Sequence, residues 1–294
     1  MSTPALSNPF GLEPAGIEER AREIRRRIVQ MNSAAGQGHT GADLSEADIL
    51  ATLFFRVLRY SPQRPADQLR DRFVLSKGHG VGGFYCTLAE AGIIPAEVLS
   101  TYLKFDSPLP GHPVRQKTPF VEINTGALGH GLSVGVGLAL SARVLAPDPA
   151  LDPAPPAGSA PPFQVYVLLG DGELQEGSNW EAAMSAAQFR LGNLVAIVDR
   201  NSLQLADRTE SIMALEPLEK KWEAFGFDVA TADGNNPEDL LRALDEFDPA
   251  GEAPHVLLAR TVKGKGVSFM EDQAAWHHKI PVGDQLRQAI EELE

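Results

Sequence analysis

Val165-Tyr166-Val167-Leu168-Leu169-Gly170-Asp171-Gly172 is the stretch of sequence that decides the fold. Its first five residues are apolar and partly β-branched, which predicts a short buried strand. A second apolar run, 193–198, ends three residues before Asn201. If the two strands are parallel, they bring Asp171 and Asn201 to the same carboxyl edge of one sheet, which is where open α/β sheets bind their ligands.

Two side chains at this edge carry oxygen atoms suited to a divalent cation. The carboxylate of Asp171 and the amide of Asn201 are hard ligands for Mg²⁺ or Ca²⁺, and Mg²⁺ typically completes its octahedron with phosphate oxygens. Gly170 and Gly172 allow the backbone to crowd around the carboxylate because they have no Cβ. A backbone carbonyl near Leu203 is the expected third protein ligand. The alternative interpretation is a tight turn after a strand and an unrelated turn asparagine.

Composition narrows the class of protein. The 294 residues are 43% hydrophobic, enough to bury the core of one large α/β domain or two small ones. The net charge of −13 disfavours non-specific nucleic-acid binding, which depends on Lys and Arg. The single cysteine, Cys86, excludes an intramolecular disulfide and a thiolate metal cluster. The sequence has neither a signal-peptide pattern nor a membrane-length apolar run, so we expect a reducing, cytoplasmic setting.

Strand and helix patterns alternate from residue 163 onward, which predicts a parallel sheet with helices on both faces. The expected strands there are 163–170, 193–199, 227–232 and 255–261. The expected helices between them are 176–191, 214–225 and 236–247. Elsewhere the patterns predict a strand at 72–76 and helices at 17–34, 43–58, 82–91, 95–104, 129–145 and 284–294.

Local signals refine this outline. Asp43 is expected to N-cap the 43–58 helix, with Glu46 completing a pattern like a capping box. Gly131, Gly135 and Gly137 lie inside the predicted 129–145 helix, where each costs up to about 1 kcal/mol, and they indicate close packing against another backbone or a ligand. Seven prolines exclude helix and central strand from 147–162. We interpret that segment as a surface insertion within a single domain spanning 1–294.

Histidines follow glycines unusually often. Imidazole is ionisable near neutrality and hydrogen-bonds to phosphate or to sugar hydroxyls, so four such pairs favour a shared site over four unrelated turn histidines. A zinc site is the competing chemistry, but the sequence has no cysteine pair and no His-x-x-x-His pair. The Gly-His pairs are at His39, His79, His112 and His130, and two further histidines form the pair His277-His278.

The sequence from Gly170 to Ala182, GDGELQEGSNWEA, resembles the thiamine-diphosphate motif of the transketolase family. The resemblance extends over roughly residues 20–290, because further short motifs occur in the order known for that family. These are Gly38-His39-Thr40-Gly41, Ser76-Lys77-Gly78-His79, Gly111-His112-Pro113, Thr125-Gly126-Ala127-Leu128-Gly129-His130-Gly131 and Trp276-His277.

The resemblance implies a cofactor and a set of site residues. It implies thiamine diphosphate with Mg²⁺ or Ca²⁺ as cofactors, and a site that handles anionic ligands within an acidic chain. The implied cofactor-binding residues are His79, Gly126, Leu128, Gly170, Asp171, Gly172, Glu173, Asn201 and His277. The implied metal ligands are Asp171, Asn201 and Leu203.

It also implies roles in catalysis. His39, His112 and His277 match histidines that line the channel to the thiazolium ring, with His278 left open as the alternative to His277. Matching carboxylates of the family join a relay between the two cofactor sites of a dimer, and the residues here are Glu176 and Glu181. Their structural alternative is a favourable interaction with the dipole of the following helix. His130 is given no catalytic role, and Trp180 is expected to pack.

The resemblance covers only the module that binds diphosphate and metal. The module that binds the aminopyrimidine and supplies the activating glutamate is missing from this sequence. We therefore expect the N-terminal subunit of a two-chain transketolase, which moves a two-carbon ketol unit between sugar phosphates. Its partner is expected to be a C-terminal subunit carrying the pyrimidine module, in an α₂β₂ assembly. The alternatives are a subunit resembling deoxyxylulose-phosphate synthase or the α subunit of a 2-oxoacid dehydrogenase, or a non-catalytic cofactor-binding chain.

Overall fold

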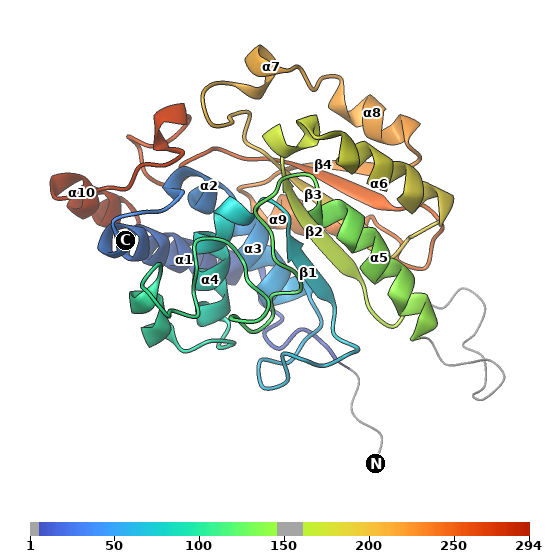
Figure 1. Ribbon diagram of the computed structural model, residues 1–294, viewed down its shortest axis with the longest axis horizontal. Helices are drawn as coiled ribbons and strands as arrows, with labels where there is room; N and C mark the ends of the chain where they lie inside the picture. The colour runs from blue at the N-terminus through green and yellow to red at the C-terminus, as the bar shows by residue number, and fades with distance from the viewer. Residues whose placement is uncertain (1–5, 146–160) are drawn as a thin grey trace.

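The computed structural model describes residues 6–145 and 161–294 (Figure 1). The predicted proline-rich insertion at 147–162 lies outside these residues, apart from its last two positions. Within the described ranges, none of the helices combines the length and the apolar character that crossing a membrane requires.

Five parallel strands form one sheet, as predicted. The order across the sheet is β1-β2-β3-β5-β4, so the two strands that carry the Asp171 and Asn201 motifs are neighbours. Gly170 pairs with Asp199 at the end of this strand pair, which confirms that the two motifs leave the sheet at the same edge. The strands are β1 (Arg72–Leu75), β2 (Val165–Gly170), β3 (Leu194–Arg200), β4 (Asp228–Asp233) and β5 (His255–Arg260).

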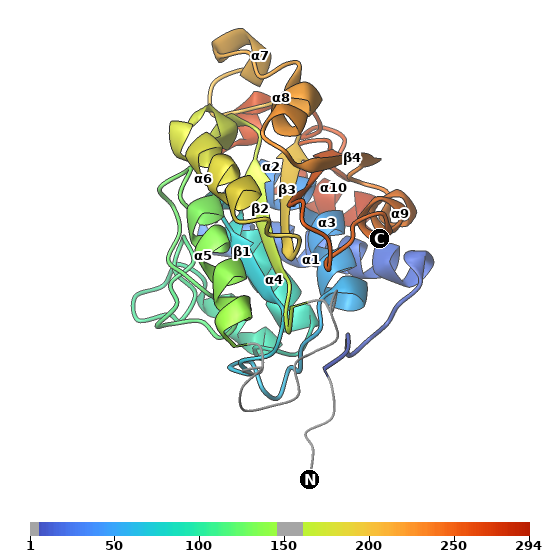
Figure 2. The same cartoon turned by 90° about the vertical axis from the view of Figure 1, so that its right-hand side faces the viewer.

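Helices cover both faces of the sheet and give the molecule three layers (Figure 2). One face is covered by α1 (Pro14–Ala35), α3 (Ala47–Thr52), α4 (Val81–Glu90) and α9 (Pro237–Asp245). The other face is covered by α5 (Gly131–Val144), α6 (Gly177–Gln188) and α8 (Leu218–Ala224). A last helix, α10 (Asp284–Glu292), packs against α1.

The central strands are apolar throughout because they are buried on both sides. Successive side chains of a strand point to opposite faces. In β2, Tyr166 and Leu168 accordingly join the core beneath α1, α3 and α4. Val165, Val167 and Leu169 join the separate core beneath α5, α6 and α8. Every residue of β2 is buried, which explains why this strand shows a continuous apolar run and no alternation with polar residues.

The predicted helix at 43–58 is wrong in two respects. The segment is broken into α2 (Thr40–Ser45), α3 and a π-helical turn at Leu53–Val57. Asp43 lies inside α2 and makes no N-cap. Its fully buried carboxylate accepts hydrogen bonds from Asn32 Nδ2 at 2.8 Å and from the Gly83 backbone N–H at 3.2 Å. A buried polar contact between distant segments, which local sequence does not reveal, replaces the expected cap.

Two further helices are shorter than predicted. The 95–104 segment forms only a 3₁₀ helix at Ala96–Thr101. The 214–225 segment is helical only in α8, which begins directly after Pro217, while a separate turn of helix, α7, occupies Thr209–Ile212. Proline has no backbone N–H to donate, so a helix begins after it more readily than it runs through it. The other short 3₁₀ turns are Gly78–Gly80, Gly172–Gln175 and Ala274–Trp276.

Candidate active site

Asp171 lies at the carboxyl edge of the sheet, directly after β2. Its side chain is 2% exposed and is held on both oxygens: Oδ1 accepts from the Gly172 backbone N–H at 2.7 Å and Oδ2 accepts from that of Ser202 at 2.6 Å. Arg200 Nη1 also donates to Oδ2 at 3.0 Å. Burial raises the pKa of Asp171, with Asp199 adding to the rise and Arg200 opposing it. The carboxylate is therefore fixed in direction before any ligand arrives.

Asn201 and Leu203 follow β3 and complete an oxygen-rich corner with Asp171. The amide Oδ1 of Asn201 accepts from the Leu203 backbone N–H at 3.1 Å, which shapes the turn that follows the strand. All three residues line one cavity of about 250 Å³. Leu128, His79 and His277 line the same cavity.

Lys263 reaches into this cavity from the segment that follows β5. Its Nζ donates to the Leu203 carbonyl oxygen at 3.1 Å and contacts His277 Nδ1 at 3.0 Å. Burial lowers the pKa of Lys263 to about 8, and repulsion from Lys77 contributes to the fall. A partly desolvated ammonium beside the oxygen-rich corner gives an acidic chain a local attraction for a diphosphate.

Lys77 lies beneath the cavity in a buried ion cluster. Its Nζ is 2.5 Å from Asp199 Oδ2 and 2.8 Å from Glu46 Oε2, and all three side chains are at most 1% exposed. Burial alone would lower the pKa of Lys77, but the two carboxylates outweigh it and raise it. Burial raises the pKa of Glu46 well above its usual range. This cluster ties β1, α2 and β3 together under the site.

Glu173 organises the loops around the cavity. Its Oε1 accepts from Ser76 Oγ and from the Gly129 backbone N–H at 2.8 Å, and Oε2 accepts from the Gly170 backbone N–H at 3.1 Å. The side chain is 2% exposed, and burial raises its pKa. Although Glu173 lines the cavity, its oxygens are engaged with the protein. These contacts hold the loops at Ser76, Gly129 and Gly170 together, and they suit Glu173 to that role better than to contacting a ligand.

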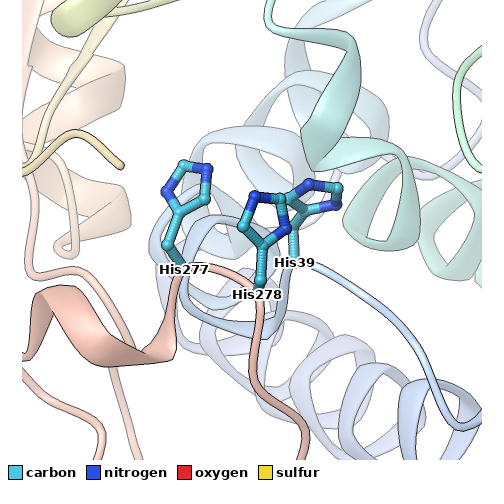
Figure 3. Close-up of side chains that lie close together, drawn as sticks. All are labelled: His39, His277 and His278. Carbon is cyan, nitrogen blue, oxygen red and sulfur yellow. The ribbon is translucent and has the colours of Figure 1, made fainter. Parts of the chain in front are cut away.

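Four segments bring histidines together above the cavity. The ring centroid of His39 lies 5.4 Å from that of His79, 6.2 Å from His112, 5.6 Å from His277 and 4.4 Å from His278. Figure 3 shows that His277 and His278, although adjacent in sequence, both lie beside His39. The predicted clustering of the Gly-His histidines is therefore present in the structure for His39, His79 and His112.

Burial favours the neutral form of four of the clustered imidazoles. Burial lowers the pKa of His39 to about 4 and that of His277 to about 3, with neighbouring histidines and lysines adding to both shifts. Burial also lowers the pKa of His112, and lowers that of His79 well below its usual range. A neutral imidazole has one donor and one acceptor nitrogen, so each is suited to sharing a proton with a hydroxyl.

Some predicted site residues lie outside this cavity. Glu176 and Glu181 are exposed at the start of α6, on the outer surface of the molecule. Gly126 has a φ of 140° and lies against the ring of His112, where a Cβ would approach that ring to 3.0 Å. His130 directly precedes α5 and is exposed. Trp180 packs against Trp222 and Phe225, as expected.

Sequence reasoning missed both lysines of the site. Lys77 stood inside a recognised motif, and Lys263 lies two residues beyond the predicted strand 255–261, at the same edge of the sheet. The position of Lys263 after a strand of the parallel sheet was a usable signal, because the carboxyl ends of all its strands meet at that edge. The pairing of Lys77 with Asp199 depended on strand order and gave no local signal.

The donor set at the corner fits a hard divalent cation. It offers one carboxylate, one amide oxygen and one backbone carbonyl, from Asp171, Asn201 and Leu203, within one cavity. Mg²⁺ uses few protein oxygens and takes the rest from water and phosphate. The flanking Lys263 and the neutral His79 and His277 supply contacts of the kind a diphosphate needs beside such a cation.

Comparisons with known proteins agree with this geometry. The family model described as "Transketolase, thiamine diphosphate binding domain" matches residues 18–292. The chain is 51% identical over 288 residues to an apulose-4-phosphate transketolase subunit of Actinobacillus succinogenes, covering 97% of this chain and 99% of that protein. It is 37% identical to 6-deoxy-6-sulfo-D-fructose transketolase subunit SqwG of a Clostridium species, covering 95% and 96%.

Solved structures give the same result. The transketolase from Leishmania mexicana superposes with a TM-score of 0.85 at 31% identity, covering 94% of this chain and 41% of that one. The chain therefore belongs to the transketolase family and has its thiamine-diphosphate-binding fold.

Within the family, the chain is the N-terminal subunit of a two-chain transketolase, a transferase of two-carbon ketol units that uses thiamine diphosphate. This confirms the expectation from the sequence motifs, and the comparisons do not favour the synthase, dehydrogenase or non-catalytic alternatives.

Proposed function

We propose that this chain supplies the diphosphate- and metal-binding half of a transketolase active site that a partner subunit completes. The observation that carries the proposal is the single cavity in which Asp171, Asn201, Lys263 and His277 meet at the carboxyl edge of the sheet. Mg²⁺ is the proposed metal, held by Asp171, Asn201 and the Leu203 carbonyl. The cofactor diphosphate would lie beside it, near His79, Gly170 and Gly172.

Each residue at the site has a task that its contacts support. Thiamine diphosphate, when bound, supplies the carbon nucleophile that carries the ketol unit. An ammonium can only donate, so the contact of Lys263 with Nδ1 of His277 favours the tautomer whose proton is on Nε2, which leaves Nε2 available as a donor. His39 and His112 are neutral and line the adjoining cavity, where they are suited to exchanging protons with sugar hydroxyls.

The partner is proposed to cover the outer face of α5 and α6. Val134 of α5 and Met184 of α6 are 37% and 55% exposed, and α5 packs against α6, so both apolar side chains are available to a partner. Glu176 and Glu181 share the exposed start of α6, which suits the relay implied by the family resemblance. We propose an α₂β₂ assembly in the cytoplasm, a single domain over 1–294, and self-association of the isolated chain.

The substrate is proposed to be a ketose phosphate. The relative at 51% identity is named for apulose 4-phosphate, and the relative at 37% identity for a sulfonated fructose. Both names describe ketoses with an anionic group far from the carbonyl, so the shared chemistry is a ketose donor with a terminal anion. Apulose 4-phosphate, a branched ketose, is the first candidate because a relative with 51% identity to this chain is named for it.

Assembly with the partner tests the proposal most directly. The chain is purified alone and together with its partner subunit, and transfer from apulose 4-phosphate is assayed with thiamine diphosphate and Mg²⁺. We expect transfer only from the mixture, because the group that activates the cofactor lies on the partner. Robust transfer by this chain alone would refute the half-site proposal, and a mixture inactive on every ketose phosphate would refute the function.

The histidines give a second test. Ala substitutions at His39, His112 and His277 are expected to leave the fold intact, because these side chains line cavities and contribute little to the core. Each should lower turnover or raise the KM for the donor by about 100- to 10,000-fold, the range for a positioned proton-transfer group. Variants with unchanged ketol transfer would show that these residues have a structural role only.

A further inference from the structure

His278 stands where two cavities of the molecule meet. The cofactor cavity described above, about 250 Å³, includes His278 in its lining. A second cavity of about 480 Å³ is lined by Gln37, His39, Tyr102 and His112, and His278 lines it too. A ligand that extends from the first cavity into the second therefore passes this side chain.

The two cavities differ in their chemistry. The cofactor cavity has the charged side chains Lys77, Asp171, Glu173 and Lys263 in its wall. Apart from His278, the described side chains that line the second cavity are an amide, a phenol, an aliphatic wall at Leu103 and the imidazoles of His39 and His112, whose pKa values burial lowers. Neutral hydrogen-bonding groups beside apolar surface suit the hydroxylated carbons of a sugar better than they suit its phosphate.

His278 itself is free to bond to a ligand. Its ring centroid lies 4.4 Å from that of His39 and 4.7 Å from that of His277, as Figure 3 shows in outline. His277 has Nδ1 in contact with Lys263, whereas neither ring nitrogen of His278 forms a hydrogen bond with the described residues. The side chain is exposed in this chain, so both nitrogens remain available to hydroxyl groups.

We propose that His278 is a specificity-determining residue, which hydrogen-bonds to hydroxyl groups of the ketose beyond the transferred two-carbon unit. This inference rests on the proposed function. A donor whose ketol end lies near His277 would extend past His278 into the second cavity. Branched and linear ketoses present their hydroxyl groups differently at that point. A side chain with two ring nitrogens that can form hydrogen bonds discriminates between them by the hydrogen bonds it makes or loses.

The test compares donors in the assembled enzyme. kcat/KM is measured for the branched apulose 4-phosphate and for the linear fructose 6-phosphate, in the wild type and in His278→Ala and His278→Asn. The matched control is Gln273→Ala, an exposed side chain of the same segment that lines neither cavity. The affinity for thiamine diphosphate is measured alongside by calorimetry, to separate a sugar contact from a cofactor contact.

We expect His278→Ala to change the ratio of the two kcat/KM values by about 3- to 10-fold, the effect of one net hydrogen bond. His278→Asn should change it less, because an amide retains a donor and an acceptor. The cofactor affinity and the Gln273→Ala ratio should stay within about 2-fold of wild type, as for a surface change away from the ligand.

Three results would overturn the inference. An unchanged ratio of the two kcat/KM values, including an equal loss for both donors, would show that His278 does not discriminate between the sugars. A weakened cofactor affinity with an unchanged ratio would assign the side chain to the cofactor. A wild-type assembly inactive on both donors and on other ketose phosphates would refute the proposed function, and this inference with it, whereas an active wild type with an unchanged ratio refutes the inference alone.

Discussion

The carboxyl edge of the sheet and the outer face of α5 and α6 differ in how fully the chain itself buries and pairs their side chains. At the edge, Lys77, Asp171 and Glu173 are at most 2% exposed, and each makes at least two polar contacts within the chain. On the outer face, Val134 and Met184 are exposed. The comparison supports the proposal that the chain builds the diphosphate and metal corner of the site from its own residues, whereas the proposed partner covers the outer face of α5 and α6.

The largest effect should come from removing a carboxylate at the edge. Asp171→Ala is expected to weaken thiamine-diphosphate binding by the Mg²⁺-loaded assembly by more than about 100-fold, because even groups that only support a metal ligand are worth 10–100-fold. Calorimetric titration of the cofactor, with and without Mg²⁺, measures the loss. Asp171→Asn, which keeps the shape of the side chain, is the control for packing. An affinity equal to wild type would disprove the metal assignment.

Breaking the buried ion cluster is expected to weaken cofactor binding less than Asp171→Ala does, and to lower the free energy of unfolding more. Lys77→Met leaves Asp199 and Glu46 buried without their counter-charge, which is expected to lower the free energy of unfolding by about 3–5 kcal/mol. Urea unfolding of the variant and the wild type gives the difference. Lys279→Met, at an exposed lysine, should change the same quantity by less than about 0.5 kcal/mol. Equal stability of the two variants would show that the cluster does not hold the edge together.

The pH dependence of stability tests the buried polar contacts below the site. Burial raises the pKa of Asp43 to about 6, so the folded state prefers the protonated carboxyl. The stability that this preference adds is complete below about pH 4 and is lost as the pH rises through about 6. The stability advantage of wild type over Asp43→Asn should therefore shrink by up to about 3 kcal/mol between pH 4 and pH 7. A pH-independent difference in urea unfolding would contradict the shift.

The smallest effect should appear at the outer face. Met184→Asp is expected to leave the fold of this chain unchanged, because the side chain is 55% exposed. It should weaken association with the partner subunit by about 10-fold or more, as for an apolar anchor placed in an interface. Sedimentation velocity over a concentration series measures the association. Gln285→Asp, on the exposed side of α10, is the matched control. Equal association of both variants with the partner would show that the interface does not include Met184.

Much of the fold could be predicted from the sequence because its signals are local. The apolar runs of β2 and β3 and the glycines around Asp171 act over a few residues, and both strands formed where expected. Asp43 was misread for the same reason. Its spacing to Glu46 matches a cap, but its partners Asn32 and Gly83 lie 11 and 40 residues away. Contacts of this kind leave no pattern in a single stretch of sequence.

The site residues likewise divide into those with a local signal in the sequence and those without one. Asp171 and Asn201 were predictable because each directly follows a strand of the sheet. The Lys77–Asp199 pair was not, since 122 residues separate the two and only the strand order brings them together. The sequence did not decide whether His277 or His278 is the site histidine. The contact of Lys263 with Nδ1 of His277 and the greater exposure of His278 show that the two side chains have different surroundings.

The glycines of α5 imply two opposite degrees of mutational tolerance within one helix. At Gly131 a Cβ would lie 2.2 Å from Ser76 Oγ, so every other amino acid would push apart the loops that Glu173 joins. Apart from its chain neighbours and the backbone of its own helix, no described residue has an atom within 4 Å of the position that a Cβ on Gly137 would take. Alanine there should raise helix stability by up to about 1 kcal/mol. A library of random variants would therefore keep Gly131 for folding alone, and would keep Gly137 only when selected together with the partner subunit.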